Sequence, residues 1–389
     1  MNIKVCGIGV VSSIGVGCGE NLRSLLSERC GIGALTLFET AIDVPVGEVG
    51  LSNGELKDLL GIDERETISR TSLLGGLAVK EALEDAGIEP GKRIGLISST
   101  TVGGMDLSER FYMDFLGNPK SGRLRYIAGH DCATSTDFIA AHCGISGFST
   151  TISTACSSAA NAIIMGAEML KRGMLDYVVA GGTDALCSFT LNGFNSLMIL
   201  DKELCRPLDR DRKGLNLGEG AGYVVLTNDP QCSKTYCSLS GYANANDAFH
   251  QTASSVDGEG AFRAMGEALG MAGLIPSGID YINLHGTGTG NNDSSELAAV
   301  RRVFGDLIPA SSSTKSFTGH TLAAAGGVEA VFSVLSIVHG VRYANLRFEN
   351  SLEEGITPVV TTQIGVDVKN VLSNSFGFGG NCSSLIFSR

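Results

Sequence analysis

The feature that most constrains the fold is a sequence that occurs twice. Residues 78–90 read AVKEALEDAGIEP and residues 264–276 read AMGEALGMAGLIP, with shared positions at an offset of 186. Such a repeat indicates two related halves. In each copy the apolar spacing predicts a helix that ends at Gly87 or Gly273. A short apolar strand follows at 94–98 or 281–284, and alternation of helix and buried strand predicts α/β layers.

Other segments repeat the strand-then-helix order. Residues 149–154 are β-branched and hydroxyl-rich, and 157–172 predict a helix that stops at Gly173. Residues 322–339 predict a deeply buried helix, and 371–389 are strand-like except for SFGFGGN. The turn-rich sequence NDPQCSKTYC at 228–237 marks the boundary, so we expect domains at 1–230 and 231–389.

Composition narrows the class of protein. The chain has 389 residues, a net charge of −12 and 52 glycines but only 8 prolines. An acidic chain is a poor nucleic-acid binder, and this length suits two or three domain-sized bodies. We therefore expect a compact protein with many tight turns and no nucleic-acid partner.

The cysteines and the apolar segments indicate the compartment. The first residues alternate into a strand and lack the basic and apolar regions of a secretory signal. The eleven cysteines contain no C-x-x-C pair, which disfavours a disulfide framework or a zinc ribbon. The uncharged run 138–167 carries too many polar residues for a membrane span. We expect a cytoplasmic protein without a membrane partner.

Cys156 lies where the predicted strand meets the predicted helix, in STACSSAANAI. Free backbone N–H groups and the positive end of a helix favour a thiolate there and offer an oxyanion site. This placement fits a nucleophile, although a buried structural cysteine has the same local sequence.

Two of the six histidines lie in Gly/Thr-rich turns beside buried elements. His285 ends a strand in INLHGTGTG, and His320 precedes a helix in KSFTGHTLAAAGG. Loops of this kind commonly hold functional sites, while each histidine alone also fits a structural role. No third ligand stands at i+4 from either, so we expect no metal site.

Two further features leave alternatives open. Lys315 and Glu329 flank His320 in sequence and could form a buried ion pair, or be a solvated lysine and an unrelated helical glutamate. The SFGFGGN segment at 375–381 could be a lid or a tight turn.

Motifs of other enzyme classes are incomplete. Gly7–Ser12 lacks the third glycine of a dinucleotide site, and there is no phosphate-binding P-loop and no G-x-S-x-G. Ser312–Lys315 fits S-x-x-K but lacks the companion motifs of penicillin-binding enzymes.

Taken in order, the motifs resemble those of the β-ketoacyl-[acyl-carrier-protein] synthases, decarboxylating condensing enzymes of the thiolase superfamily, especially the synthase II type. The resemblance spans the chain through GIGVVSSIG, ISTACSSAANAI, VVAGGTDA, RPLDRDRKGLNLGEGAG, LHGTGTGNNDSSE, KSFTGHTLAAAGGVEA and SNSFGFGGN. It implies a five-layer αβαβα fold made of two duplicated halves, with the site between them, and a homodimer.

The resemblance also implies residue roles. Cys156 matches the acyl-accepting nucleophile, and His285 and His320 match the histidines of decarboxylation and condensation. Lys315 and Glu329 match an electrostatic and structural pair. The N–H groups of Cys156 and Phe378 match the oxyanion hole, and Phe378 also matches a gate.

Further positions follow from the same resemblance. We expect Asp293 and Glu296 to have a structural role. We expect five residues to bind substrate, namely Phe194, Thr287, Thr289, Gly377 and Gly379.

Some segments depart from the family pattern. Gly290 stands where proline is usual, and Asn381–Cys382 replaces the frequent Thr-Asn. Residues 105–137, which in the family contribute acyl pocket and dimer surface, look short and atypical. Chain-length preference is therefore not inherited.

An acidic acyl carrier protein needs a local basic patch on this chain. The candidates are Arg65, Arg70, Lys120, Arg123, Arg125, Arg206, Arg210 and Lys213, which could equally be solvated charges or internal pairs.

We predict condensation of an acyl thioester with malonyl-acyl-carrier protein in fatty-acid elongation. No metal or redox cofactor is expected, and phosphopantetheine enters only as the carrier's arm. The close alternative is a polyketide or aryl-polyene ketosynthase that works with a nonidentical chain-length partner. A non-decarboxylating acyltransferase, such as a thiolase, is disfavoured by the second histidine, and a noncatalytic partner subunit by the presence of Cys156.

Overall fold

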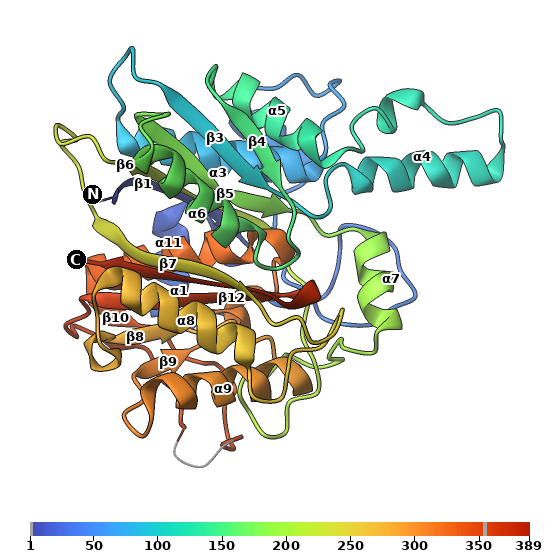
Figure 1. Ribbon diagram of the computed structural model, residues 1–389. Coiled ribbons are helices and arrows are strands. Elements are labelled where there is room, and N and C mark those ends of the chain that lie inside the picture. Colours follow the sequence, from blue (N-terminus) through green and yellow to red (C-terminus); the bar gives the residue numbers. More distant parts are fainter. Residues whose placement is uncertain (1–2, 353–355) are drawn as a thin grey trace.

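The computed structural model describes residues 3–352 and 356–389, which form one large mixed sheet system covered by helices (Figure 1). The first half contributes five strands of the main path: β1 (Ile3–Ser12), β3 (Ile94–Ser99), β4 (Ser149–Ile152), β5 (Tyr177–Asp184) and β6 (Gly220–Thr227). The second half contributes β7 (Cys237–Asn246), β8 (Tyr281–Asn283), β9 (Ala310–Ser312), β12 (Asn370–Gly377) and β13 (Asn381–Ser388). Short strands are β2 (Gly15–Val16), β10 (Val341–Arg342) and β11 (Gln363–Ile364).

The strand order shows the duplication directly. It runs β4-β3-β5-β6-β1 and then β7-β13-β12-β8-β9. Counted outward from the middle, β1 corresponds to β7, and the outermost strand β4 corresponds to β9. Pairings of β3 with β4 and β5 are parallel, as are those of β8 with β9 and β12. The remaining pairings on the path are antiparallel, including β1 with β7, where Val5 faces Cys237. The two halves therefore meet at a pseudo-twofold axis between β1 and β7.

The helices occupy three layers around the two half-sheets. The first outer layer holds α3 (Arg70–Ala86) and α5 (Cys132–His142), and the second holds α8 (Glu259–Ala272) and α9 (Gly290–Phe304). Between the half-sheets lie α6 (Ser158–Lys171) and α11 (Ala325–His339) (Figure 1). Their apolar side chains belong to one continuous core. This arrangement confirms the predicted five-layer α/β fold with two duplicated halves.

Five further helices complete the described part of the fold. They are α1 (Cys18–Leu26), α2 (Asn53–Leu60), α4 (Met105–Gly117), α7 (Ser188–Ser196) and α10 (Lys315–Thr318). Single 3₁₀ turns are η1 (Leu124–Tyr126), η2 (Pro276–Gly278), η3 (Leu322–Ala324) and η4 (Phe378–Gly380). Of these elements α4 projects furthest from the body of the molecule, and every one of its residues is described and none is buried (Figure 1).

The repeated sequence forms equivalent elements in the two halves. Its copies are the ends of α3 and α8, and both helices stop at a glycine in the left-handed region, Gly87 at φ 58° and Gly273 at φ 65°. Glycine has no Cβ to oppose this conformation, which explains the stop. The strands predicted at 94–98 and 281–284 are β3 and β8.

The helix predicted over 322–339 begins later than expected. Leu322 takes φ 53°, and residues 322–324 form a 3₁₀ turn before α11 starts at Ala325. The buried Asp184 carboxylate accepts the N–H of Ala323 at 2.8 Å and holds this turn. The stretch 322–339 is long and apolar enough to cross a membrane, but 89% of it is buried inside the protein, as in a core helix.

Close contact between α11 and β6 depends on glycine. A Cβ on Gly327 would lie 2.2 Å from the carbonyl oxygen of Gly222, a distance that packing cannot accept. Gly266 in α8 is exposed and has open space at the same position.

We predict opposite effects for alanine at these two helical glycines. Gly327→Ala should lower the free energy of unfolding by about 1–3 kcal/mol because α11 must move off the sheet. Gly266→Ala should raise it by about 0.5–1 kcal/mol because alanine has the higher helix propensity. Urea denaturation measures both, and equal stability of the two variants would contradict this packing.

Candidate active site

Cys156 lies at a sharp turn between β4 and α6, as predicted. The preceding residue, Ala155, has φ 52°, a left-handed conformation that is costly for a residue with a Cβ. The Ser158 hydroxyl donates to the Ala155 carbonyl and accepts the N–H of Thr154 at 2.8 Å. The turn is therefore tied down locally and presents the Cys156 thiol to the space between the two halves.

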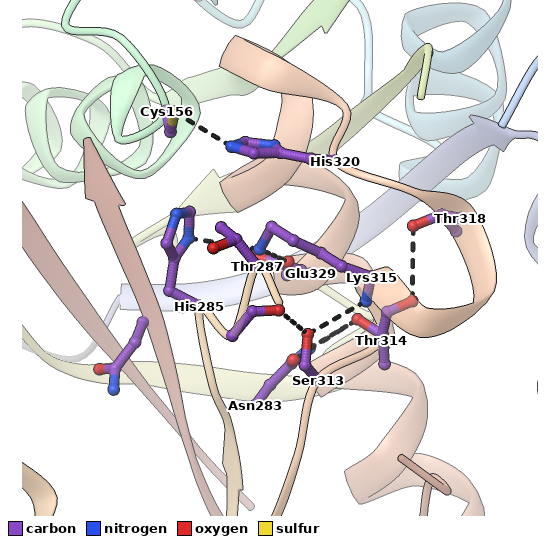
Figure 2. Close-up of polar contacts among 12 residues, drawn as sticks. Cys156, Asn283, His285, Thr287, Ser313, Thr314, Lys315, Thr318, His320 and Glu329 are labelled. Carbon is purple, nitrogen blue, oxygen red and sulfur yellow. Dashed lines mark hydrogen bonds and ion pairs between the residues drawn. The ribbon is translucent and has the colours of Figure 1, made fainter. Parts of the chain in front are cut away.

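Both predicted histidines lie beside this thiol. Nε2 of His320 is 3.1 Å from Sγ of Cys156, and the ring of His285 is 5.3 Å from that of His320, edge to face (Figure 2). One potential ligand atom from each of the three residues lies within 4.8 Å of the others. The first half thus supplies the sulfur and the second half both imidazoles.

The hydrogen bonds on the far side of each ring fix its tautomer. Nζ of Lys315 lies 3.2 Å from Nδ1 of His285, and since an ammonium can only donate, Nδ1 must accept (Figure 2). Nδ1 of His320 accepts the N–H of Leu322 at 3.1 Å. Each neutral ring therefore carries its proton on Nε2, so that two N–H donors are available on the thiol side. A resident metal ion would need these two nitrogens without their protons, so the residues fit such an ion poorly.

Burial and the nearby Lys315 charge keep both rings neutral. Burial, together with the Lys315 ammonium, holds the pKa of His285 and of His320 well below the usual range. Lys315 forms a buried ion pair with Oε1 of Glu329. Burial raises the pKa of Glu329 to about 7, with the lysine acting in the opposite direction. Of the two alternatives for Lys315 and Glu329, the buried pair is the one that the structure contains.

The thiol is less acidic than its position at a helix start suggested. Burial raises the pKa of Cys156 to about 11, although the Lys315 charge and the N–H groups of Phe378 and Cys156 act to lower it. Loss of solvation outweighs these three contributions. The two N–H groups lie close enough to the sulfur to lower its pKa, so they border the place where the oxygen of a thioester on Cys156 would lie.

The histidine loop is held by two buried carboxylates. Glu296 accepts the N–H groups of His285 and Gly286, each at 2.8 Å, and burial raises its pKa to about 7. Asp293 accepts the N–H groups of Thr287 at 3.0 Å and Leu208 at 2.7 Å. These contacts orient the loop from below and correspond to the structural role expected for both residues.

A cavity of about 190 Å³ leads from the surface to the thiol. All five residues expected to bind substrate line it: Phe194, Thr287, Thr289, Gly377 and Gly379. The ring of Phe378 stacks on Phe194 with centroids 6.1 Å apart. Lys315 and Glu329 lie behind His285 and do not line the cavity.

Part of the cavity rim was not predicted. Thr252, Ala253 and Ser254 line it, from a loop far in sequence from any motif. The amide of Asn291 bonds the N–H of Ser254 at 2.7 Å and its carbonyl at 3.1 Å, which brings the loop to the start of α9. Asn291 directly follows the GTGTG motif. Its position beside that motif is the one sequence feature that could have indicated this part of the rim.

One candidate for the basic patch, Arg70, forms an internal pair, which is one of the alternatives left open by the sequence. Arg70 is 3% exposed, and its guanidinium pairs with the buried Glu219 and donates to the carbonyls of Val49 and Leu51. A buried guanidinium with its donors satisfied cannot attract a carrier protein. The other candidates lie partly or fully at the surface, where Arg206, Arg210 and Lys213 have acidic partners.

Comparisons with known proteins agree with this geometry. The family model described as the beta-ketoacyl synthase N-terminal domain matches residues 1–231, and that of the C-terminal domain matches 236–349. A "3-oxoacyl-[acyl-carrier-protein] synthase 2" from Rhizobium meliloti is 34% identical over 100% of this chain and 98% of its own length. The Vibrio cholerae protein of the same name is 31% identical over 100% and 99%.

Solved structures give the same result. The ishigamide ketosynthase/chain length factor matches with a TM-score of 0.94 and 28% identity, covering 100% of this chain and 98% of the other. A ketosynthase in complex with its chain length factor from Xenorhabdus doucetiae matches with a TM-score of 0.85 and 30% identity, covering 100% and 98%.

We predict that iodoacetamide alkylates Cys156 about tenfold faster for each pH unit between 7 and 10, because only the thiolate reacts and burial places the pKa at about 11. Lys315→Met should slow alkylation at every pH in this range, because the charge that lowers the thiol pKa is removed. Peptide mass mapping at Cys156 measures the rate.

Lys202→Met, at an exposed position, is the matched control and should behave as wild type. A plateau below pH 9 would contradict this description.

Proposed function

Because this chain belongs to the β-ketoacyl synthase family, we propose that it is an acyltransferase that elongates an acyl chain by decarboxylative condensation. An acyl group on Cys156 joins malonyl-acyl-carrier protein to give a β-ketoacyl thioester in fatty-acid elongation. The observation that carries this proposal is the grouping of one thiol with two neutral imidazoles and two backbone N–H groups. Nε2 of His320 contacts the Cys156 sulfur, and His285 places a ring nitrogen within 4.8 Å of both.

The first half-reaction loads the enzyme. The Cys156 sulfur attacks the acyl thioester carbonyl, and the carrier thiol leaves with the proton that the cysteine gives up. The N–H groups of Cys156 and Phe378 lie close to the sulfur, so they border the place of the oxygen of the tetrahedral intermediate.

The second half-reaction forms the carbon–carbon bond. The bond from the malonyl carbon to its carboxylate breaks, carbon dioxide leaves, and the electron pair moves onto the thioester oxygen. The Nε2–H groups of His285 and His320 can donate to this enolate oxygen, each worth a few kcal/mol by analogy with other oxyanion donors, about 3–4 at most. The enolate carbon then attacks the acyl carbonyl, and the released Cys156 thiolate takes up a proton. Since no net oxidation occurs, we propose that no redox cofactor takes part.

Partners follow from the proposed substrates. We propose that an acyl carrier protein delivers both thioesters, with phosphopantetheine as its arm in the cavity. A matching solved structure, 25% identical with a TM-score of 0.87, is a type II polyketide acyl-carrier protein in complex with its ketosynthase. Lys120, Arg123 and Arg125 lie exposed in the segment after α4 and are candidates for its docking.

A second function has specific support. Two of the matching structures are ketosynthases with a chain length factor, which favours a specialised ketosynthase that pairs with a nonidentical chain. The chemistry at Cys156 would be the same, and the partner would differ.

The cellular location is also a proposal. All eleven cysteines are described, and none is in a disulfide. Free cysteines in this number suit a reducing compartment, and we propose the cytoplasm.

Loading of Cys156 is the test of the proposed function. We expect incubation with acyl-carrier thioesters to add one acyl mass to wild type and none to Cys156→Ala, as measured by intact-mass spectrometry. Malonyl-carrier protein should then discharge the adduct into a β-ketoacyl product. Two outcomes would contradict an elongating synthase. One is that the acyl-enzyme turns over without malonyl-carrier protein, and the other is that no donor acylates Cys156.

We further propose that two copies associate through β4 and α4. β4 is an edge strand of the described sheet, and the projecting segment α4–η1 exposes Met113 at 68% and Leu124 at 74%. Unpaired edges and grouped apolar side chains favour a protein interface.

We predict that wild type sediments as a dimer of the 40.4 kDa chain. The double variant Met113→Glu/Leu124→Glu should sediment as a monomer, because charge opposes burial of this surface. Ile275→Glu changes an equally exposed residue, at 70%, on the other half of the chain and should stay dimeric. A monomeric wild type that dimerises only with a second, nonidentical chain would favour the chain-length-partner alternative.

A further inference from the structure

A cluster of asparagine side chains lies directly behind the nucleophile turn. Oδ1 of Asn381 accepts hydrogen bonds from the Ser157 hydroxyl at 3.0 Å, from Nδ2 of Asn161 at 3.0 Å and from Nδ2 of Asn244 at 2.6 Å. Ser383 extends the cluster by donating to Oδ1 of Asn161 at 2.8 Å. One oxygen atom thus collects three donors.

The cluster joins the two halves at the reacting residues. Ser157 directly follows Cys156, and Asn161 lies one turn further along α6 in the first half. Asn381 begins β13 in the second half, and in the hairpin it pairs with Gly377 across the turn that carries Phe378. Asn381 is therefore bonded at once to the turn of the nucleophile and to the turn of the expected gate.

The hydrogen bond between Asn381 and Ser157 is buried on the side of the nucleophile turn. The Ser157 side chain is fully buried, and its single hydroxyl proton is shared between Oδ1 of Asn381 and the closer carbonyl of Thr154, at 2.7 Å. Nδ2 of Asn161 bonds Oγ1 of Thr154 at 2.9 Å, so the amide spans both ends of the turn. A Cβ on Gly377 would lie 3.0 Å from the N atom of Cys156, which shows how closely β12 passes the same turn.

We propose that Asn381 is a positioning residue that sets the Cys156 thiol against the N–H of Phe378 and the ring of His320. The proposal rests on the proposed function and goes beyond it, because Asn381 is not among the described residues that line the cavity. It acts through Ser157. Misplacement of a reacting group by about 1 Å can lower the reaction rate about 100-fold. Loss of the Asn381 acceptor next to the nucleophile turn is therefore expected to slow the reaction at Cys156.

The contact also predicts how substitutions differ. All three partners of Oδ1 are donors, and aspartate keeps an acceptor of the same shape. Alanine removes the acceptor and leaves the buried Ser157 hydroxyl with one partner fewer. Asn370, at the opposite end of the same hairpin, donates to the carbonyl of Gly278 at 2.8 Å and provides a matched control.

The experiment compares Asn381→Ala, Asn381→Asp and Asn370→Ala for acylation of Cys156 from an acyl-carrier thioester. We expect Asn381→Ala to slow acylation at saturating donor at least tenfold, with KM within about twofold of wild type. Asn381→Asp should recover most of this rate, and Asn370→Ala should match wild type. The second readout is the pH dependence of iodoacetamide alkylation at Cys156, which needs no substrate. Asn381→Ala should move it to higher pH, because the N–H of Phe378 no longer aligns with the sulfur.

The outcomes separate the two proposals. Equal acylation and equal alkylation profiles for Asn381→Ala and Asn370→Ala would overturn the positioning role. If wild type takes no acyl group, the proposed function fails, and the alkylation profiles still decide the role of Asn381. If Asn381→Ala does not fold, Asn161→Ala breaks the same contact from the other half, and the same slowing is expected of it. Thermal unfolding of each variant shows whether it is folded.

Discussion

The ammonium of Lys315 is buried between the two histidines and the helix α11, and much of the site depends on this one charge. A buried ion costs several kcal/mol unless it is paired, and Glu329 in α11 is its partner. The same ammonium makes Nδ1 of His285 an acceptor, and it lowers the pKa of both imidazoles and of the Cys156 thiol. The ammonium therefore sets the tautomer of His285, while the N–H of Leu322 sets that of His320, and both rings keep an Nε2–H donor for the substrate.

This arrangement requires the duplicated fold. The chain places Cys156 in the first half and both histidines in the second, so neither half holds the reacting set alone. Pairing of β1 with β7 joins the half-sheets, and the contact of Gly327 with Gly222 brings α11, with Glu329, against β6 of the first half. The asparagine contact of Asn381 with Ser157 then connects the two turns that face each other across the thiol. Each of these contacts crosses the boundary between the halves.

The sequence was informative where local chemistry decides the structure. Glycines after apolar runs marked the ends of α3 and α8. Cys156 and His285 follow strands, and His320 precedes a helical segment, as their sequence context indicated. It was less informative where distant segments decide the outcome. The late start of α11 reflects a carboxylate, Asp184, from another strand. The burial of Arg70 depends on Glu219, far along the chain, and the raised pKa of Cys156 depends on packing that no local pattern contains.

In the acyl-enzyme, the thioester oxygen on Cys156 should lie between N–H groups from the two halves. A crystal structure of the protein acylated on Cys156 tests this placement. We expect the acyl oxygen about 2.7–3.1 Å from the N atoms of both Cys156 and Phe378, with the ring of His320 still beside the sulfur. An acyl oxygen that points away from Phe378, or a Phe378 turn displaced from the thiol, would contradict it.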